Sequence, residues 1–198
     1  MTRTWLITGG SQGLGKALVL AALEAGDRVV ATSRKPEALA SLVAEHPERL
    51  AAVALDVTSP AQAREVVAAA VQRFGSIDLV VNNAGYATSG SIEDFPEEEF
   101  RAQVEANLYG VVNVTRAVLP VMRGQRSGHI VQISSIGGRV GGTPGLGAYQ
   151  TAKFAVEVLR GPRQRSGPVG HQGHHRRAGW YPHRLGHRGR RALRSHHA

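Results

Sequence analysis

The sequence has no cysteine and no long apolar run, and each absence excludes a class of protein. Without cysteine there is neither a disulfide framework nor a cysteine-ligated metal site, so we expect a reducing, cytoplasmic setting. No apolar run approaches the ~20 residues that span a bilayer, and the short apolar stretch after Met1–Thr4 is unlike a signal peptide. The 198 residues, 42% of them hydrophobic, suit one soluble globular domain with a buried core.

Acidic residues are missing from the end of the chain. All 15 lie before residue 159, together with 14 of the 24 basic residues, whereas residues 159–198 hold 10 arginines and 7 of the 9 histidines. The net charge of +9 therefore belongs to this tail. The nearly neutral remainder is not typical of a nucleic-acid-binding domain.

Before the tail, short β-branched runs alternate with longer helical patterns, which predicts an α/β fold with a doubly wound parallel sheet. The ligand crevice of such a sheet lies at the carboxyl ends of its strands. The predicted strands are Trp5–Thr8, Arg28–Ala31, Ala51–Asp56, Ile77–Asn82 and His129–Ser134. The predicted helices are Leu14–Ala25, Pro36–Glu45, Pro60–Phe74 and Pro96–Met122, with a further helix beginning near Tyr149.

A glycine-rich turn, Thr8-Gly9-Gly10-Ser11-Gln12-Gly13-Leu14-Gly15, joins the first predicted strand to the first helix. Glycines let the backbone approach a pyrophosphate, whose charge is met by amide groups at the helix N-terminus. The same turn is also compatible with a purely structural role. Dinucleotide binding is the favoured interpretation.

Two further loops follow predicted strands. Asp56-Val57 places a carboxylate where it can accept a hydrogen bond from an adenine amino group, although aspartate is equally common as a turn residue. Asn82-Asn83-Ala84-Gly85 places small residues at a strand end, where they allow a ligand close to the backbone or form a bare turn.

Tyr149 and Lys153 are four residues apart on a predicted helix and therefore share one face. A free tyrosine has a pKa near 10, and a neighbouring cation lowers that value by favouring the phenolate. Such a pair can act as an acid/base. Exposed helices also carry this spacing by chance, and the position of the pair after Ile133-Ser134-Ser135 favours the functional interpretation.

With these motifs in this order, the sequence resembles the short-chain dehydrogenase/reductase family over roughly residues 1–157. The resemblance implies a Rossmann-type subunit that transfers hydride between a nicotinamide cofactor and an alcohol or carbonyl substrate. It also implies that Tyr149 exchanges the proton, Ser135 binds the reacting oxygen, Lys153 supports the tyrosine and holds the nicotinamide ribose, and Asn107 orders a relay water. The cofactor-binding residues that it implies are Gly9, Ser11, Gly13, Leu14, Gly15, Ser33, Arg34, Asp56, Val57, Asn83, Ala84, Gly85, Tyr149 and Lys153.

The choice of serine depends on spacing. The family usually places its catalytic serine thirteen residues before the tyrosine, whereas Ser135 lies fourteen and Ser134 fifteen residues before Tyr149. We assign the role to Ser135 and attribute the difference to one added residue in the loop of residues 137–147. Ser134 is then structural.

Cofactor preference is predicted from the end of the second strand. An acid there bonds both ribose hydroxyls of NAD and repels a 2′-phosphate, which arginine attracts. Ser33 stands at the acid's position and Arg34 follows it. The sequence therefore favours NADP(H) over NAD(H). It predicts no metal, and it does not define the substrate.

The tail departs from the family, and we expect a cofactor-binding catalytic domain at residues 1–157 and a disordered basic tail at residues 158–198. The tail can be a lineage-specific extension, a nucleic-acid arm or a histidine-rich metal binder. The hypothesis that explains most is a change of reading frame near Val158. For residues 171–179, codons can be chosen that, when the reading frame is shifted by one base, encode Ile-Lys-Val-Thr-Ile-Val-Glu-Pro-Gly, which is typical of a strand followed by a turn. The same shift lets the codons of residues 161–170 encode Val-Leu-Ala-Asn-Glu-Val-Gly-Pro-Leu-Gly.

On that hypothesis the C-terminal strands of the sheet are missing or corrupted and the chain as written can be inactive. Family members often pair as dimers or tetramers through the helices around Asn107 and Tyr149, so an intact chain is expected to do the same. The sequence predicts a small-molecule carbonyl or alcohol substrate, with no membrane and no nucleic acid as partner. The alternative from another class is a non-catalytic dinucleotide-binding module with a basic nucleic-acid-binding tail.

Overall fold

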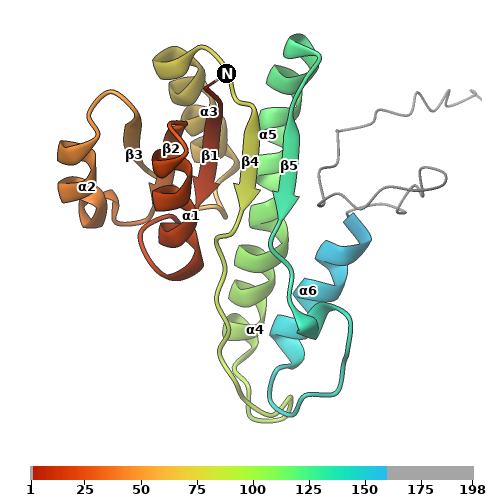
Figure 1. The fold of residues 1–198 in the computed structure, drawn as a ribbon. Helices are drawn as coiled ribbons and strands as arrows, with labels where there is room; N and C mark the ends of the chain where they lie inside the picture. Colours follow the sequence, from red (N-terminus) through yellow and green to blue (C-terminus); the bar gives the residue numbers. More distant parts are fainter. Residues whose placement is uncertain (1, 160–198) are drawn as a thin grey trace, which may run out of the picture.

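A parallel five-stranded sheet forms the centre of the computed structural model, which describes residues 2–159. The strand order is β3-β2-β1-β4-β5, so the chain builds outward from β1 in both directions (Figure 1). All four strand pairings are parallel. The predicted doubly wound α/β fold is therefore confirmed. The strands are β1 (Thr4–Thr8), β2 (Arg28–Ser33), β3 (Leu50–Ala54), β4 (Leu79–Asn82) and β5 (His129–Gln132).

Helices connect successive strands, as right-handed parallel crossovers require. They are α1 (Gly13–Glu24), α2 (Ala40–Glu45) after a 3-10 turn η1 (Pro36–Leu39), α3 (Pro60–Phe74), α4 (Glu97–Val104), α5 (Gly110–Gln125) and α6 (Gly147–Leu159). A π-helical segment η2 (Glu105–Tyr109) joins α4 to α5, and a 3-10 turn η3 (Ile136–Gly138) follows β5. No helix within residues 2–159 combines the length and the apolarity that a membrane crossing requires.

Two apolar cores cover the two faces of the sheet. Because neighbouring strand residues point to opposite faces, Leu6 packs in one core with side chains of α3 and α5, and Ile7 packs in the other with side chains of α1. Both residues are fully buried. A parallel sheet needs this cover on both faces, which explains why its strands are almost continuously apolar.

The predicted boundaries differ from the observed ones mainly at the carboxyl ends of strands. β3 ends at Ala54 rather than Asp56, because the Asp56 carboxylate accepts hydrogen bonds from the backbone and hydroxyl of Thr58 and closes a turn. β5 ends at Gln132 rather than Ser134. The single helix predicted over residues 96–122 is divided by the π-helical segment.

The opposite end of the sheet is held by Asp27. Its carboxylate accepts hydrogen bonds from the Arg3 backbone N–H and from Nε1 of Trp5, each at 2.8 Å, and pairs with the Arg3 guanidinium at 3.3 Å. Burial acts to raise the pKa of Asp27, but these hydrogen bonds and the Arg3 charge outweigh it and lower the pKa below its ordinary value. This contact fixes the start of β1 against the start of β2.

The predicted basic tail of residues 158–198 lies outside the described residues except for its first two positions, which end α6.

Candidate active site

Most of the predicted site residues lie at or just after the carboxyl ends of the five strands, and the sheet gathers these positions at one edge; Asn107, Tyr149 and Lys153 come from helical segments. The glycine-rich turn follows β1, Ser33 ends β2, Asp56 follows β3, Asn83 follows β4, and Ser135 follows β5. Because all five strands are parallel, their carboxyl ends meet at the same edge. The Tyr149-Lys153 helix begins after the β5 loop.

The glycine-rich turn packs too tightly for side chains at its base. Gly9 has a φ of +66° and Gly13 a φ of +52°, the left-handed region that favours glycine. A Cβ at Gly15 would overlap the Gly9 carbonyl oxygen and lie 2.6 Å from Nδ2 of Asn83. The first turn of α1 therefore lies against the loop, with Ser11 and Leu14 toward its more open side and Leu14 53% exposed.

Thr8 joins the β1 and β4 loops. Its buried hydroxyl oxygen accepts hydrogen bonds from the backbone N–H groups of Asn83 and Ala84, both at 3.0 Å. In return, Nδ2 of Asn83 donates to the backbone carbonyls of Thr8 and Gly9. Sequence reasoning assigns a cofactor role to Asn83 and none to Thr8, because these contacts join residues about 75 positions apart.

The Asp56-Val57 loop is held from two sides. Hydrogen bonds from Thr58 lower the pKa of Asp56 below its ordinary value, with a smaller contribution from the Arg34 charge at the end of β2. Nδ2 of Asn113 on α5 donates to the Val57 carbonyl at 3.0 Å. Asn113 is a positioning residue for which no local sequence signal exists.

Asn107 is completely buried in the π-helical segment. Its Nδ2 donates to the carbonyls of Tyr86 at 2.8 Å and Gln103 at 2.9 Å, while its Oδ1 is buried without a protein partner. Such π-helical insertions recur at functional sites. A Cβ at Gly85 would overlap this Oδ1 and lie 3.7 Å from Nζ of Lys153, so Asn107, Gly85 and Lys153 converge on one point.

Lys153 lies inward on α6 and is only 4% exposed. Its Nζ donates a hydrogen bond to the Ile133 carbonyl at 2.9 Å and lies 5.7 Å from the centre of the Tyr149 ring. Burial lowers the pKa of Lys153 below its ordinary value. Tyr149 is partly exposed, so the helix presents its phenol ring at the surface of the site with a buried cation beside it.

The two candidate serines have different surroundings. The Ser135 hydroxyl accepts a hydrogen bond from the Gly137 N–H at 3.1 Å, which caps η3 and leaves the hydroxyl proton outside that bond. The Ser134 hydroxyl is buried without a protein partner, and a Cβ at Gly138 would lie 2.7 Å from it.

Gln150 closes the loop between Ser135 and Tyr149, a contact that sequence reasoning missed. Its buried side chain donates to the Val140 carbonyl at 3.1 Å and to the Thr143 hydroxyl at 3.0 Å. The N–H of Gly90 donates to the Gly145 carbonyl, which ties this loop to the segment that follows β4. The two loops therefore hold one another in place beside Tyr149.

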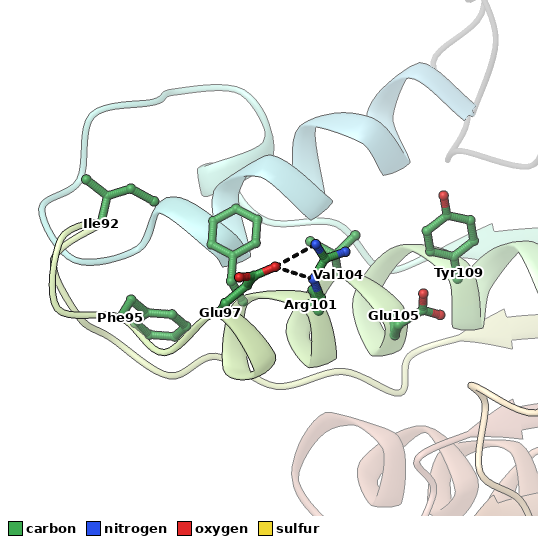
Figure 2. A pocket seen from close by; sticks show the side chains of 8 residues that line it. Ile92, Phe95, Glu97, Arg101, Val104, Glu105 and Tyr109 are labelled. Atoms are coloured by element: carbon green, nitrogen blue, oxygen red, sulfur yellow. Dashed lines mark hydrogen bonds and ion pairs between the residues drawn. The ribbon is translucent and has the colours of Figure 1, made fainter.

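An open groove of about 610 Å³ lies elsewhere, along α4 and the π-helical segment. Figure 2 shows its apolar side chains and the Glu97–Arg101 ion pair, which runs along α4. None of the predicted site residues lines this groove. The candidate active site is instead the strand edge described above. The groove residues are Ile92, Phe95, Glu97, Phe100, Arg101, Val104, Glu105 and Tyr109.

The parallel sheet and its glycine-rich strand-to-helix turn define a Rossmann-type α/β protein. The sequence model of the family described as short chain dehydrogenase matches residues 3–161. The chain therefore belongs to the short chain dehydrogenase family.

Individual relatives agree with this assignment. Oxidoreductase BOA17 of Botryotinia fuckeliana is 56% identical over 157 residues, which are 79% of this chain and 57% of that protein. A short chain dehydrogenase/reductase from Burkholderia phymatum, solved in complex with NAD, is 29% identical with a TM-score of 0.76. ElxO with NADP bound is 33% identical with a TM-score of 0.75. The two alignments cover 80% of this chain, and they cover 57% and 65% of those structures. The chain therefore spans 57–65% of the length of these three relatives.

Proposed function

We propose that this protein is an NADP(H)-dependent oxidoreductase that interconverts a carbonyl compound and an alcohol, with Tyr149 as its acid/base. The observation that carries the proposal is the convergence of Lys153, Asn107 and Gly85 beside the Tyr149 ring. A buried cation next to a partly exposed phenol, with an unpartnered buried amide oxygen close by, is suited to proton exchange.

The residues present fit a dinucleotide. Because Gly15 has no Cβ, the first turn of α1 lies close against the glycine-rich turn. The N-terminus of α1 therefore offers backbone amide groups to a pyrophosphate. The Asp56-Val57 loop is held firmly enough to meet an adenine, and Gly85 lets a ligand approach beside Lys153. When bound, the dinucleotide supplies the hydride in reduction and accepts it in oxidation.

In reduction, Tyr149 donates its phenolic proton to the substrate oxygen as that oxygen gains negative charge. The Lys153 ammonium favours the phenolate that remains, because opposite charges attract strongly where water is excluded. Ser135 donates its hydroxyl proton in a hydrogen bond to the same oxygen and so orients the carbonyl. Oδ1 of Asn107 accepts from a water through which the proton of Tyr149 is replaced.

Arg34 supports the preference for NADP(H). It is exposed at the end of β2, and Ser33, which occupies the position of a discriminating acid, has its hydroxyl engaged by the Lys35 N–H. Replacing Arg34 with alanine is expected to weaken NADPH binding by about 10- to 100-fold, the effect of one charge-assisted hydrogen bond, and to leave NADH binding almost unchanged. Arg64→Ala, on the exposed side of α3, is the matched control. Equal effects on the two cofactors would refute the preference.

The decisive experiment compares NADPH-dependent reduction of a carbonyl panel by the parent chain and by Tyr149→Phe. Loss of one acid/base group is expected to lower kcat/KM by about 10²- to 10⁴-fold while the dissociation constant for NADPH stays within a factor of about two. Tyr109→Phe, which removes a hydroxyl from the remote groove, should leave both unchanged. Tight NADPH binding without reduction of any panel member would favour the non-catalytic alternative.

A further inference from the structure

Gln103, on the last turn of α4, is a polar side chain with no exposed surface. Both ends of its amide bond to the backbone of Thr88. Oε1 accepts from the Thr88 N–H at 3.1 Å, and Nε2 donates to the Thr88 carbonyl at 3.3 Å. Thr88 belongs to residues 83–96, which form neither helix nor strand. The amide therefore supplies the two bonds that a neighbouring strand would otherwise supply, and it fixes Thr88 against α4.

The fixed segment also holds Asn107. Nδ2 of Asn107 donates to the Tyr86 carbonyl at 2.8 Å, and Tyr86 lies two residues before Thr88. The same Nδ2 donates to the backbone carbonyl of Gln103 at 2.9 Å. Gln103 therefore contacts Asn107 directly through its own carbonyl, and indirectly through the segment that its side chain fixes.

These two contacts determine which way the Asn107 amide points. Nδ2 donates to two carbonyls, so Oδ1 lies on the other side of the amide, where a Cβ at Gly85 would overlap it and would lie 3.7 Å from Nζ of Lys153. Turning the amide over would bring Oδ1 against the carbonyl oxygens of Tyr86 and Gln103, and neither of these can donate a proton. Oδ1 therefore stays beside Lys153 only while both carbonyls stay in place.

We propose that Gln103 is a positioning residue for Asn107. By fixing the segment that carries the Tyr86 carbonyl, it keeps Oδ1 of Asn107 beside Lys153, where this oxygen accepts from a water. Gln103 itself exchanges no proton with the substrate. The inference rests on the proposed function, because the oriented Oδ1 serves the relay that returns a proton to Tyr149.

Gln125 provides a matched control, because it makes the same pair of bonds at the opposite end of the sheet. Its Oε1 accepts from the Ile77 N–H at 3.0 Å, and its Nε2 donates to the Ile77 carbonyl at 2.9 Å. Ile77 precedes β4, whereas Thr88 follows it. Methionine keeps the unbranched shape of glutamine and removes both bonds. Gln125→Met therefore reports the general cost of losing them, whereas Gln103→Met adds the effect on Asn107.

Hydrogen exchange of the Asn107 side-chain amide, followed by NMR in the full 198-residue chain, tests the orientation without turnover. Because this amide is buried and bonded, the parent should exchange at least about 10-fold more slowly than a free amide. Gln103→Met should speed the exchange at least about 10-fold, and Gln125→Met should leave it within a factor of about two. Parental exchange at the rate of a free amide, which needs no variant to fold, overturns the proposal. Equal exchange in the two variants also overturns it.

Steady-state kinetics with NADPH and a carbonyl substrate test the role in the relay. Gln103→Met should lower kcat by about 10- to 100-fold, the effect of a misplaced catalytic group, while KM and the dissociation constant for NADPH stay within a factor of about two. In an Asn107→Ala background the same substitution should lower kcat by less than about twofold more, because the group that it positions is absent. An equal loss of kcat in both backgrounds, or the same loss in Gln125→Met, overturns the proposal. Unchanged turnover in Tyr149→Phe would instead refute the proposed function, and the exchange rates would still decide whether Gln103 orients Asn107.

Discussion

Replacing Gly15 with alanine is expected to damage both stability and cofactor affinity. The new Cβ would overlap the Gly9 carbonyl oxygen and lie 2.6 Å from Nδ2 of Asn83, where ordinary contacts begin near 3.4 Å. Either the glycine turn moves away from α1, or Asn83 releases the carbonyls of Thr8 and Gly9. The clash costs about 1–3 kcal/mol and each lost hydrogen bond about 1 kcal/mol, against a helix-propensity gain of about 1 kcal/mol.

With both hydrogen bonds lost, the net loss is about 2–4 kcal/mol in the free energy of unfolding, measured by urea titration with circular dichroism. Because the displaced atoms belong to the proposed pyrophosphate site, the dissociation constant for NADPH should rise at least about 10-fold. Gly124→Ala is the matched control. It makes the same chemical change on α5, has no heavy atom within 4 Å of the new Cβ, and should be neutral or slightly stabilising. The reasoning is wrong if Gly15→Ala unfolds at the same urea concentration as the parent.

Three other substitutions test separate contacts. Burial lowers the pKa of Lys153, so between that lowered value and about 10.5 the unfolded state binds more protons than the folded state. The free energy of unfolding, measured by urea titration, should therefore rise with pH in this window, and Lys153→Met should abolish the rise. Gln150→Leu removes the donors to Val140 and Thr143, should cost about 1–3 kcal/mol, and should speed tryptic cleavage after Arg139, whereas unchanged cleavage would count against the proposed closure of the loop. The pKa of the Asp27 carboxylate is lowered, so its contribution to stability is present above about pH 3.9 and is lost as the pH falls through the lowered pKa. Asp27→Asn should therefore lower the free energy of unfolding by about 1–3 kcal/mol at pH 7 and by clearly less at pH 3. A loss that does not depend on pH would contradict this account.

Much of the fold follows from local sequence signals. The alternation of apolar runs with helical patterns predicts all five strands and their parallel pairing. Ser59-Pro60 marks the start of α3, where the Ser59 hydroxyl accepts a hydrogen bond from the Gln62 N–H. These signals succeed because periodicity, caps and turns act over a few residues. The spacing of Tyr149 and Lys153 likewise predicts that both lie on one helix, and α6 carries them.

Tertiary structure decided the contacts that join distant loops. Thr8 meets Asn83 and Ala84, Asn113 holds Val57, and the Gly85 backbone lies beside Asn107 and Lys153 only because parallel strands bring their carboxyl ends together. The π-helical turn at Asn107 has no local sequence signature, and its amide bonds to the carbonyls of Gln103 and of Tyr86, which lies 21 residues away. Sequence determined which elements form and in what order. The packing of those elements determined which polar groups are buried together, because that depends on residues far apart in the chain.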